Sequence, residues 1–215
     1  MTVLSVAAIK GGVGKTTLSL NIAIALALRG KSVWLIDADH QASASQALAN
    51  RAALDRAPSI ATAHYANKDQ LKAQLTLMAP KFDYVVIDCG GGDGPILRTA
   101  LIQSDIVLVP FQPRSIDVWA LQGIAQNIGE IQDVKALQAF AVLNMADVQG
   151  KDNQEAAEAV SEFKNLTLLD TPIRRRKSFA NAAGEGLSVL EHEPADQKAR
   201  AELAALVNAV FSLAN

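Results

Sequence analysis

The chain has 215 residues, of which 50% are hydrophobic and 20% charged, and its formal net charge at pH 7 is −2. This composition is typical of a globular protein, and it excludes a uniformly basic nucleic-acid binder. It leaves room for a local basic patch, because affinity for phosphates follows the field at the contact face. The single cysteine, Cys89, excludes an intrachain disulfide and a cysteine-rich metal site within one chain.

The chain carries no sign of a targeting or membrane-spanning segment. It starts MTVLSVAAIK, without the basic stretch of a signal peptide, and no apolar run approaches the ~20 residues that span a bilayer. We therefore expect a cytoplasmic protein without stable membrane insertion. No repeat or Pro/Ser-rich linker divides it, so residues 1–215 are expected to form one domain.

Short apolar runs alternate with helical patterns along the chain, which predicts βα units on a parallel sheet. The runs are continuous, as in strands covered on both faces. The expected strands are Val3–Ile9, Ser32–Asp37, Tyr84–Asp88, Ile106–Val109, Phe140–Asn144 and Leu166–Leu169. The expected helices are Lys15–Arg29, Ala42–Leu54, Asp69–Ala79, Ile96–Gln103, Ser115–Ile131, Gln154–Lys164 and Gln197–Leu213. We expect a single-domain, doubly wound α/β fold whose mainly parallel sheet is flanked by helices, with ligands at the carboxyl ends of the strands.

The first strand–helix junction reads KGGVGKTT. Its glycines allow backbone N–H groups to point at phosphate oxygens, and the helix that follows adds its positive dipole end. In this interpretation Lys15 reaches the β- and γ-phosphates, the Thr16 hydroxyl ligates Mg²⁺, and Thr17 bonds the α-phosphate. The residues assigned to the nucleotide here are Gly11, Gly12, Val13, Gly14, Lys15, Thr16 and Thr17. The alternative is a glycine-rich turn with an incidental lysine.

Ile9 stands where the strict phosphate-loop pattern has its first glycine, and Lys10 lies beside it. The form K-G-G-x-G-K-T-T resembles the deviant Walker A loop of the ParA/MinD family of P-loop ATPases. The resemblance implies ATP and Mg²⁺ as cofactors. It also implies that the extra lysine, Lys10, reaches across a homodimer to the partner's nucleotide and acts with Lys15 in catalysis.

Aspartates end the next two strands. Asp37 and Asp39 begin a segment that looks like the family's D-x-D-P-Q, with His40 in place of proline. We expect Asp39 to orient the attacking water and Asp37 to support the magnesium shell; capping of the next helix is the alternative for Asp39. Asp88 ends an apolar run of the Walker B type and is expected to hold Mg²⁺ through a water.

The loop after Asp88 has glycines at 90, 91, 92 and 94. We expect it to deform as a γ-phosphate-sensing switch, although a plain long loop is the alternative. Related proteins usually show D-T-P-P here, so the version with Cys89 departs from the pattern. Cys89 is expected to be a small buried spacer rather than a nucleophile.

The N-x-x-D spacing of Asn144 and Asp147 resembles the base-reading segment of P-loop GTPases. In ParA/MinD-like proteins the asparagine position contacts adenine, so Asn144 is assigned to the base; a plain strand-end turn is the alternative. ATP rather than GTP follows from the resemblance and not from the spacing. The proline-containing segment 110–113 matches a family loop but marks any loop equally well.

The segment from Thr171 resembles the C-terminal motif of ParA proteins, which extends the likeness from residue 3 to about 189. It holds the densest positive run of the chain: Arg174, Arg175, Arg176 and Lys177. Four phosphate contacts imply a salt slope of about −3.6 on duplex DNA, and a dimer doubles it. These four residues are therefore the candidate DNA-binding patch. The alternatives are a solvated helix face and nucleotide contact by one arginine.

Together these features resemble small ParA-type partition proteins that lack an N-terminal DNA-binding domain. The resemblance implies an ATP-dependent sandwich dimer that binds DNA non-specifically and segregates or positions plasmid, chromosome or protein cargo at the nucleoid. A ParB-like or other adaptor would stimulate its hydrolysis of ATP.

Two other classes compete with this interpretation. A MinD-like membrane regulator needs a basic amphipathic tail, and the tail after Arg200 has no Lys or Arg. Among metabolic relatives, the nitrogenase iron protein needs two cluster cysteines per subunit, and dethiobiotin synthetase needs a substrate pocket that the sequence does not reveal.

Overall fold

The computed structural model describes residues 1–113, 115–148 and 151–213, with the backbone alone at 115–119. Its strands are β1 Thr2–Val6, β2 Val33–Ala38, β3 Ala61–His64, β4 Tyr84–Cys89, β5 Ile106–Phe111, β6 Gln138–Ala146, β7 Thr167–Leu168 and β8 Ile173–Arg174. Its helices are α1 Lys15–Leu28, α2 Ser43–Ala53, α3 Lys68–Met78, η1 Ala79–Lys81, α4 Pro95–Gln103, α5 Ser115–Gln132, α6 Asp152–Ser161, α7 Lys177–Gly184 and α8 Gln197–Ser212. The last two residues of the expected tail lie outside the described residues.

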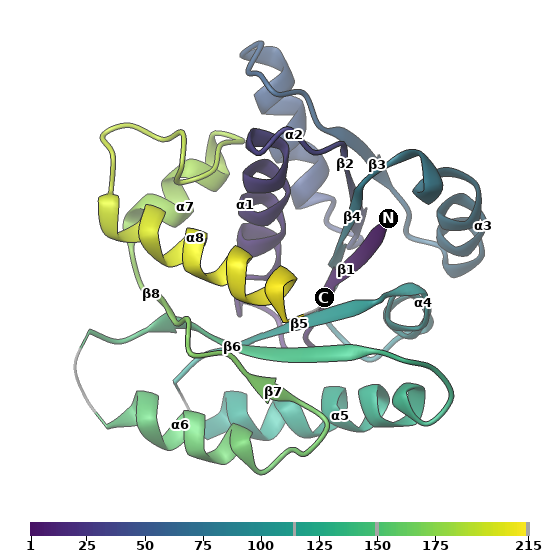
Figure 1. Cartoon of the computed structure of the whole chain (residues 1–215), viewed down its shortest axis with the longest axis vertical. Helices are drawn as coiled ribbons and strands as arrows, with labels where there is room; N and C mark the ends of the chain where they lie inside the picture. Colours follow the sequence, from purple (N-terminus) through teal and green to yellow (C-terminus); the bar gives the residue numbers. More distant parts are fainter. Residues whose placement is uncertain (114, 149–150, 214–215) are drawn as a thin grey trace.

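The strands form one twisted parallel sheet in the order β3-β2-β4-β1-β5-β6-β7, with β8 paired to β6. Helices α1, α2, α7 and α8 cover one face, and α3, α4, α5 and α6 cover the other (Figure 1). The expected α/β fold is therefore confirmed. Strand residues alternate between two cores: Trp34 and Ile36 pack toward α3 and α4, whereas Leu35 packs toward α1. This is why the strands read as unbroken apolar runs.

The predicted strands occur with changed bounds. The first ends at Val6 rather than Ile9, because the backbone leaves the sheet to form the loop before α1. Strand β6 is longer than predicted, and the predicted strand at Leu166–Leu169 is reduced to two residues. Elements β3, β8 and α7 were not predicted. Strand β3 is short and mostly exposed at the sheet edge, so it lacks the apolar pattern on which the prediction depends.

Among the described residues, no helix is long and apolar enough to cross a membrane. Helix α8 has an apolar face, formed by Leu203, Leu206, Val207 and Val210, but each of these side chains is fully buried against the sheet side of the molecule. The tail therefore folds as a docked helix.

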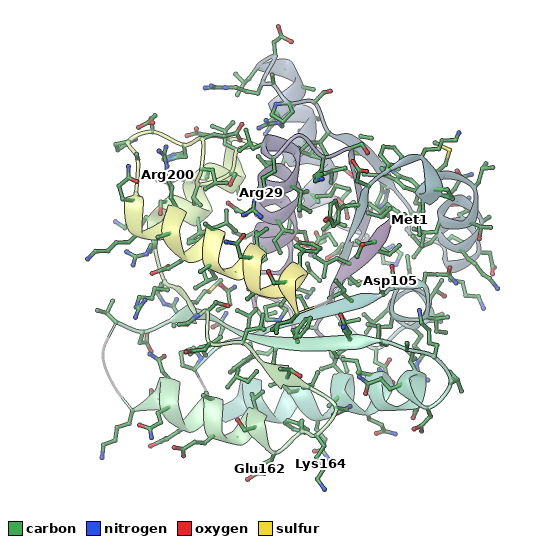
Figure 2. The ribbon with its side chains drawn as sticks, in the orientation of Figure 1. Met1, Arg29, Asp105, Glu162, Lys164 and Arg200 are labelled. Atoms are coloured by element: carbon green, nitrogen blue, oxygen red, sulfur yellow. The ribbon has the colours of Figure 1, made fainter. Side chains whose placement is uncertain are left out.

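Strand β1 lies between β4 and β5, so the loop that follows it emerges at the middle of the carboxyl edge. The register places Asp88 beside both Val6 and Asp37. On the other side, Phe111 pairs with Leu143, which brings the residues after β5 and near the end of β6 together. The opposite, amino edge carries Met1 and Asp105 (Figure 2). The predicted site residues of four strands thus meet at one edge.

Candidate nucleotide-binding site

The loop between β1 and α1 depends on glycine. Gly12 and Gly14 have φ angles of +78° and +91°, which side chains of L-residues rarely adopt. A Cβ on Gly14 would also collide with the Asn144 side-chain nitrogen. Helix α1 starts at the next residue without a side-chain cap, so its first N–H groups face the loop. Such a loop can receive an anion.

Two side-chain amides hold the loop from neighbouring strands. Asn144 Nδ2 donates to the Val13 carbonyl at 2.7 Å, and Gln112 Nε2 donates to the Gly12 carbonyl at 2.9 Å. Both side chains are buried. Asn144 thus lies against the phosphate loop, and its contact with a base stays a prediction. Gln112 was not predicted as a site residue, although it lies inside the proline-containing segment 110–113.

Lys15 is folded into the loop rather than extended into solvent. It is only 7% exposed, and its Nζ donates to the Lys10 carbonyl at 3.0 Å. Burial lowers the pKa of Lys15, while the nearby carboxylates of Asp88 and Asp39 act to raise it. A buried ammonium that bonds one neutral carbonyl gains more from an anionic partner, such as the phosphates assigned to it.

Asp88 is fully buried at the end of β4. Its Oδ1 accepts from the Ser19 hydroxyl at 3.0 Å, and its Oδ2 has no hydrogen-bond partner among the described residues. Burial raises the pKa of Asp88 to about 7; Asp37 adds to this rise, and a hydrogen bond from Thr16 opposes it. An unpartnered buried carboxylate oxygen signals a missing partner.

The residues at this point fit a magnesium ion. Thr16 and Asp88 offer the oxygen donors that Mg²⁺ prefers, and the unpartnered Oδ2 could accept from a metal-bound water. No group of three or more His, Cys, Asp or Glu side chains that could hold a metal occurs among the described residues. Mg²⁺ suits such a site, since it keeps several waters and shares substrate phosphates, whose charge it neutralises.

Without nucleotide and Mg²⁺, Asp88→Asn is expected to stabilise the protein at about pH 8. The folded pKa of Asp88 lies above its ordinary value of 3.8, so its contribution to stability is lost as the pH rises through about 7. Asparagine carries no charge to bury, so the gain is up to about 4 kcal/mol at pH 8 and smaller at pH 5. Urea unfolding at both pH values measures it.

Asp83→Asn is the matched control, because Asp83 is exposed and hydrogen bonds from Ser32 lower its pKa. That replacement should give no gain at about pH 8. A gain from Asp88→Asn that is equal at both pH values would contradict the assigned cause.

Asp37 and Asp39 do different work in the turn after β2. Asp37 accepts backbone N–H bonds from Asp39 at 3.1 Å and from Ser45 at 2.8 Å, so it caps α2. Among the residues that the structure describes, Asp39 Oδ1 accepts from the Gln41 N–H alone, in the same turn. The helix cap that was an alternative for Asp39 is therefore supplied by Asp37. Asp39 is half-buried and lies on the side of Lys15.

The glycine-rich loop after β4 is held at two consecutive residues, Gly92 and Asp93. The Gly92 N–H donates to the Ile9 carbonyl at 2.7 Å. Asp93 pairs with Arg98 at 3.3 Å and accepts from the buried Asn127 amide at 3.0 Å. Any Cβ on Gly90 would come within 3.4 Å of Asp39. The loop thus touches the phosphate loop and Asp39 together, which is the contact that a γ-phosphate sensor needs.

The four cations of the positive run differ in their surroundings. Glu202 on α8 pairs with Arg174 at 3.3 Å and with Arg176 at 2.7 Å, and these pairs fix the wall of a pocket beside Thr17. Arg175 and Lys177 are exposed and form no ion pair with a described residue. The pocket has a volume of about 290 Å³ and is lined by Thr17, Leu18, Asn144, Met145, Ile173, Arg174, Arg175, Arg176, Lys177, Phe179 and Ala180. The pocket adjoins the phosphate loop through Thr17, Leu18 and Asn144.

A family model described as the CobQ/CobB/MinD/ParA nucleotide binding domain matches residues 4–189. This chain belongs to that family. The match ends at the loop after α7, and the structure shows how that loop joins the site. Asn21 on α1 accepts from the Ser188 hydroxyl and the Val189 N–H, both at 2.9 Å, and donates to the Thr17 carbonyl at 2.8 Å. The C-terminal motif of this CobQ/CobB/MinD/ParA chain therefore packs on the phosphate-loop helix.

One relative is the maintenance of carboxysome distribution protein A of Halothiobacillus neapolitanus, 32% identical over 97% of this chain and 95% of the relative. Among solved structures, the cell division ATPase MinD of Pyrococcus furiosus superposes with a TM-score of 0.78 at 21% identity, covering 99% of both chains. An ATP complex of McdA from Cyanothece gives 0.76 at 18% identity, covering 99% of this chain and 96% of the other. The resemblance to the ParA/MinD family is confirmed.

Proposed function

We propose that residues 1–215 form a ParA-type ATPase domain that uses ATP to switch between a monomer and a sandwich homodimer. The observation that carries this proposal is the loop itself: beneath it Lys15 lies near Asp88, whose Oδ2 has no hydrogen-bond partner among the described residues. Triphosphate and Mg²⁺ would satisfy both buried groups. Hydrolysis would then need only a positioned water and charge neutralisation.

We further propose that the dimer binds DNA without sequence preference through Arg175 and Lys177. The carboxylates of Glu202 and Asp196 together offset the charges of Arg174 and Arg176, so Arg175 and Lys177 remain as two exposed cations per protomer. A single protomer then offers two phosphate contacts and a dimer four. Because each contact adds to the salt-dependent binding free energy, dimerisation would convert weak binding into appreciable binding.

For the cargo, the similarity to the carboxysome distribution protein favours a protein microcompartment or another large assembly over a plasmid. An adaptor protein on that cargo would stimulate hydrolysis and release the dimer from DNA. We propose that the protein acts in the cytoplasm, bound to the DNA of the nucleoid. The docked α8, whose apolar face is buried, gives no support to the MinD-like alternative of reversible membrane binding; co-sedimentation with anionic liposomes and ATP would reveal it.

DNA binding is expected with ATP and Mg²⁺ but not with ADP or without nucleotide. A dimer with four contacts should show a slope of about −3.6 in log K against log salt, whereas eight contacts would give about −7.2. Arg175→Ala should reduce the slope to about −1.8, since it removes one contact per protomer. Fluorescence anisotropy with a labelled duplex at several salt concentrations measures both.

Lys164→Ala serves as the control, because Lys164 is an exposed lysine between α6 and β7, at the far end of the molecule from α7 (Figure 2). Equal DNA binding with ATP, with ADP and without nucleotide would show that the nucleotide does not control DNA binding. Absence of binding in every state would remove DNA from the proposal and leave the ATPase to be tested separately.

A further inference from the structure

Gln112 follows β5 and reaches the phosphate loop from one side of β1, whereas Asp88 lies in β4 on the other side of β1. Its Nε2 donates to the Gly12 carbonyl at 2.9 Å and to the Met145 sulfur at 3.2 Å. The side chain is 8% exposed, so few waters can replace these bonds. Gln112 therefore contacts the backbone of the phosphate loop directly, at Gly12.

The geometry of the peptide unit gives these bonds a consequence for the loop. In a trans peptide the carbonyl of one residue and the N–H of the next point in opposite directions. A bond that holds the Gly12 carbonyl toward Gln112 therefore turns the Val13 N–H the other way. The bond from Asn144 to the Val13 carbonyl does the same for the N–H of Gly14.

The backbone at the end of β6 supports this arrangement. Met145 has a φ angle of +54°, a left-handed conformation that costs free energy in a residue other than glycine. That turn places the Met145 sulfur on Gln112 and leaves the preceding residue, Asn144, against Val13. With Met145 in this conformation, the side-chain amides of Gln112 and Asn144 bond the successive carbonyls of Gly12 and Val13.

We infer that Gln112 is a positioning residue of the nucleotide site, which acts with Asn144 to orient the N–H groups of Val13 and Gly14 toward the phosphates. The inference rests on the nucleotide binding proposed above. Gln112 touches no phosphate in this role; it preorganises the donors, so that binding does not have to order them.

The test compares Gln112→Met and Gln112→Ala in the full chain, with ATP and ADP affinities measured by fluorescence titration in Mg²⁺. Methionine has nearly the length of glutamine but no donor, so it separates the hydrogen bond from packing. We expect both variants to bind each nucleotide about tenfold more weakly, the size of one buried hydrogen bond. Amide hydrogen exchange in residues 10–17 should be faster in both variants without nucleotide.

Gln132→Met is the matched control. Gln132 is a partly buried glutamine of α5, and its Nε2 also donates to backbone carbonyls, those of Leu137 at 2.9 Å and Asn165 at 3.3 Å. It should lower the urea midpoint by an amount similar to that of Gln112→Met, yet leave nucleotide affinity and exchange at 10–17 unchanged.

Parental affinity and exchange in Gln112→Met would overturn the inference, since packing alone would then explain the residue. If Gln112→Met is too unstable for titration, the exchange of residues 10–17 relative to the rest of its chain decides in the same way. A parent protein that binds no nucleotide would overturn the proposed function first and this inference with it, so the two failures are distinguishable.

Discussion

Lys10→Ala is expected to abolish ATP-dependent dimerisation while ATP still binds to the single protomer. The resemblance to the deviant Walker A loop assigns the Lys10 side chain to the partner's nucleotide, and in this structure the Lys10 carbonyl accepts from Lys15 Nζ. Replacing Lys15 removes a buried cation next to the phosphates and should weaken ATP binding by roughly 100-fold, the scale of a truncated buried charge pair. Dimerisation is then lost as a consequence.

Two assays distinguish the role of Lys10 in dimerisation from the role of Lys15 in ATP binding. Sedimentation velocity with a slowly hydrolysed ATP analogue reports dimers, and a fluorescent analogue reports binding to the protomer. Lys31→Ala, at an exposed lysine between α1 and β2, should behave as the parent protein in both assays. If Lys10→Ala forms dimers as readily as the parent protein, the cross-subunit role is wrong.

The sequence predicted those parts of the site whose chemistry is local. Lys15, Thr16 and the glycines before them lie within one strand–loop–helix unit, so their order alone indicates a phosphate loop. Asp88 was predicted in the same way, from an apolar run that ends in an acidic residue. The parallel sheet then brings these strand ends to one edge, and this part of the expectation needed no knowledge of side-chain contacts.

Contacts between residues distant in the sequence were beyond prediction. Gln112 meets Gly12 across 100 positions, and it is one of several polar residues near a proline. Glu202 meets Arg176 across 26 positions, and with Asp196 it offsets the charges of Arg174 and Arg176 in the predicted DNA patch. The first contact depends on the strand order that places β5 beside β1. The second depends on which face of the sheet α8 covers, and the hydrophobic pattern of α8 does not encode that choice.

The two aspartates after β2 illustrate the same limit at short range. Their spacing indicated that both lie near the phosphates, but it did not reveal which of them caps α2. The structure gives the cap to Asp37, because its buried carboxylate can reach both the Asp39 and the Ser45 N–H groups. The Asp39 carboxylate is thereby left with one hydrogen bond among the described residues, from the Gln41 N–H.

Asp39→Asn is therefore expected to slow ATP hydrolysis by about 100-fold or more while ATP-dependent dimers persist. The amide keeps an oxygen that can accept from the Gln41 N–H, so the turn is preserved, but it removes the negative charge that would orient the attacking water. Binding and dimerisation depend on Lys15 and Lys10 instead. Phosphate release at saturating ATP, measured beside sedimentation velocity, separates the two effects.

Asp69→Asn provides the matched control, because Asp69 is an exposed aspartate in the first turn of α3 and should leave hydrolysis unchanged. Asp37→Asn has a different expected signature: its charge supports the cap of α2, so its loss lowers the free energy of unfolding as well as the rate. Hydrolysis at the parental rate in Asp39→Asn would show that another group orients the water. A rate loss matched by an equal loss of stability would assign Asp39 to the fold of the turn and not to the chemistry.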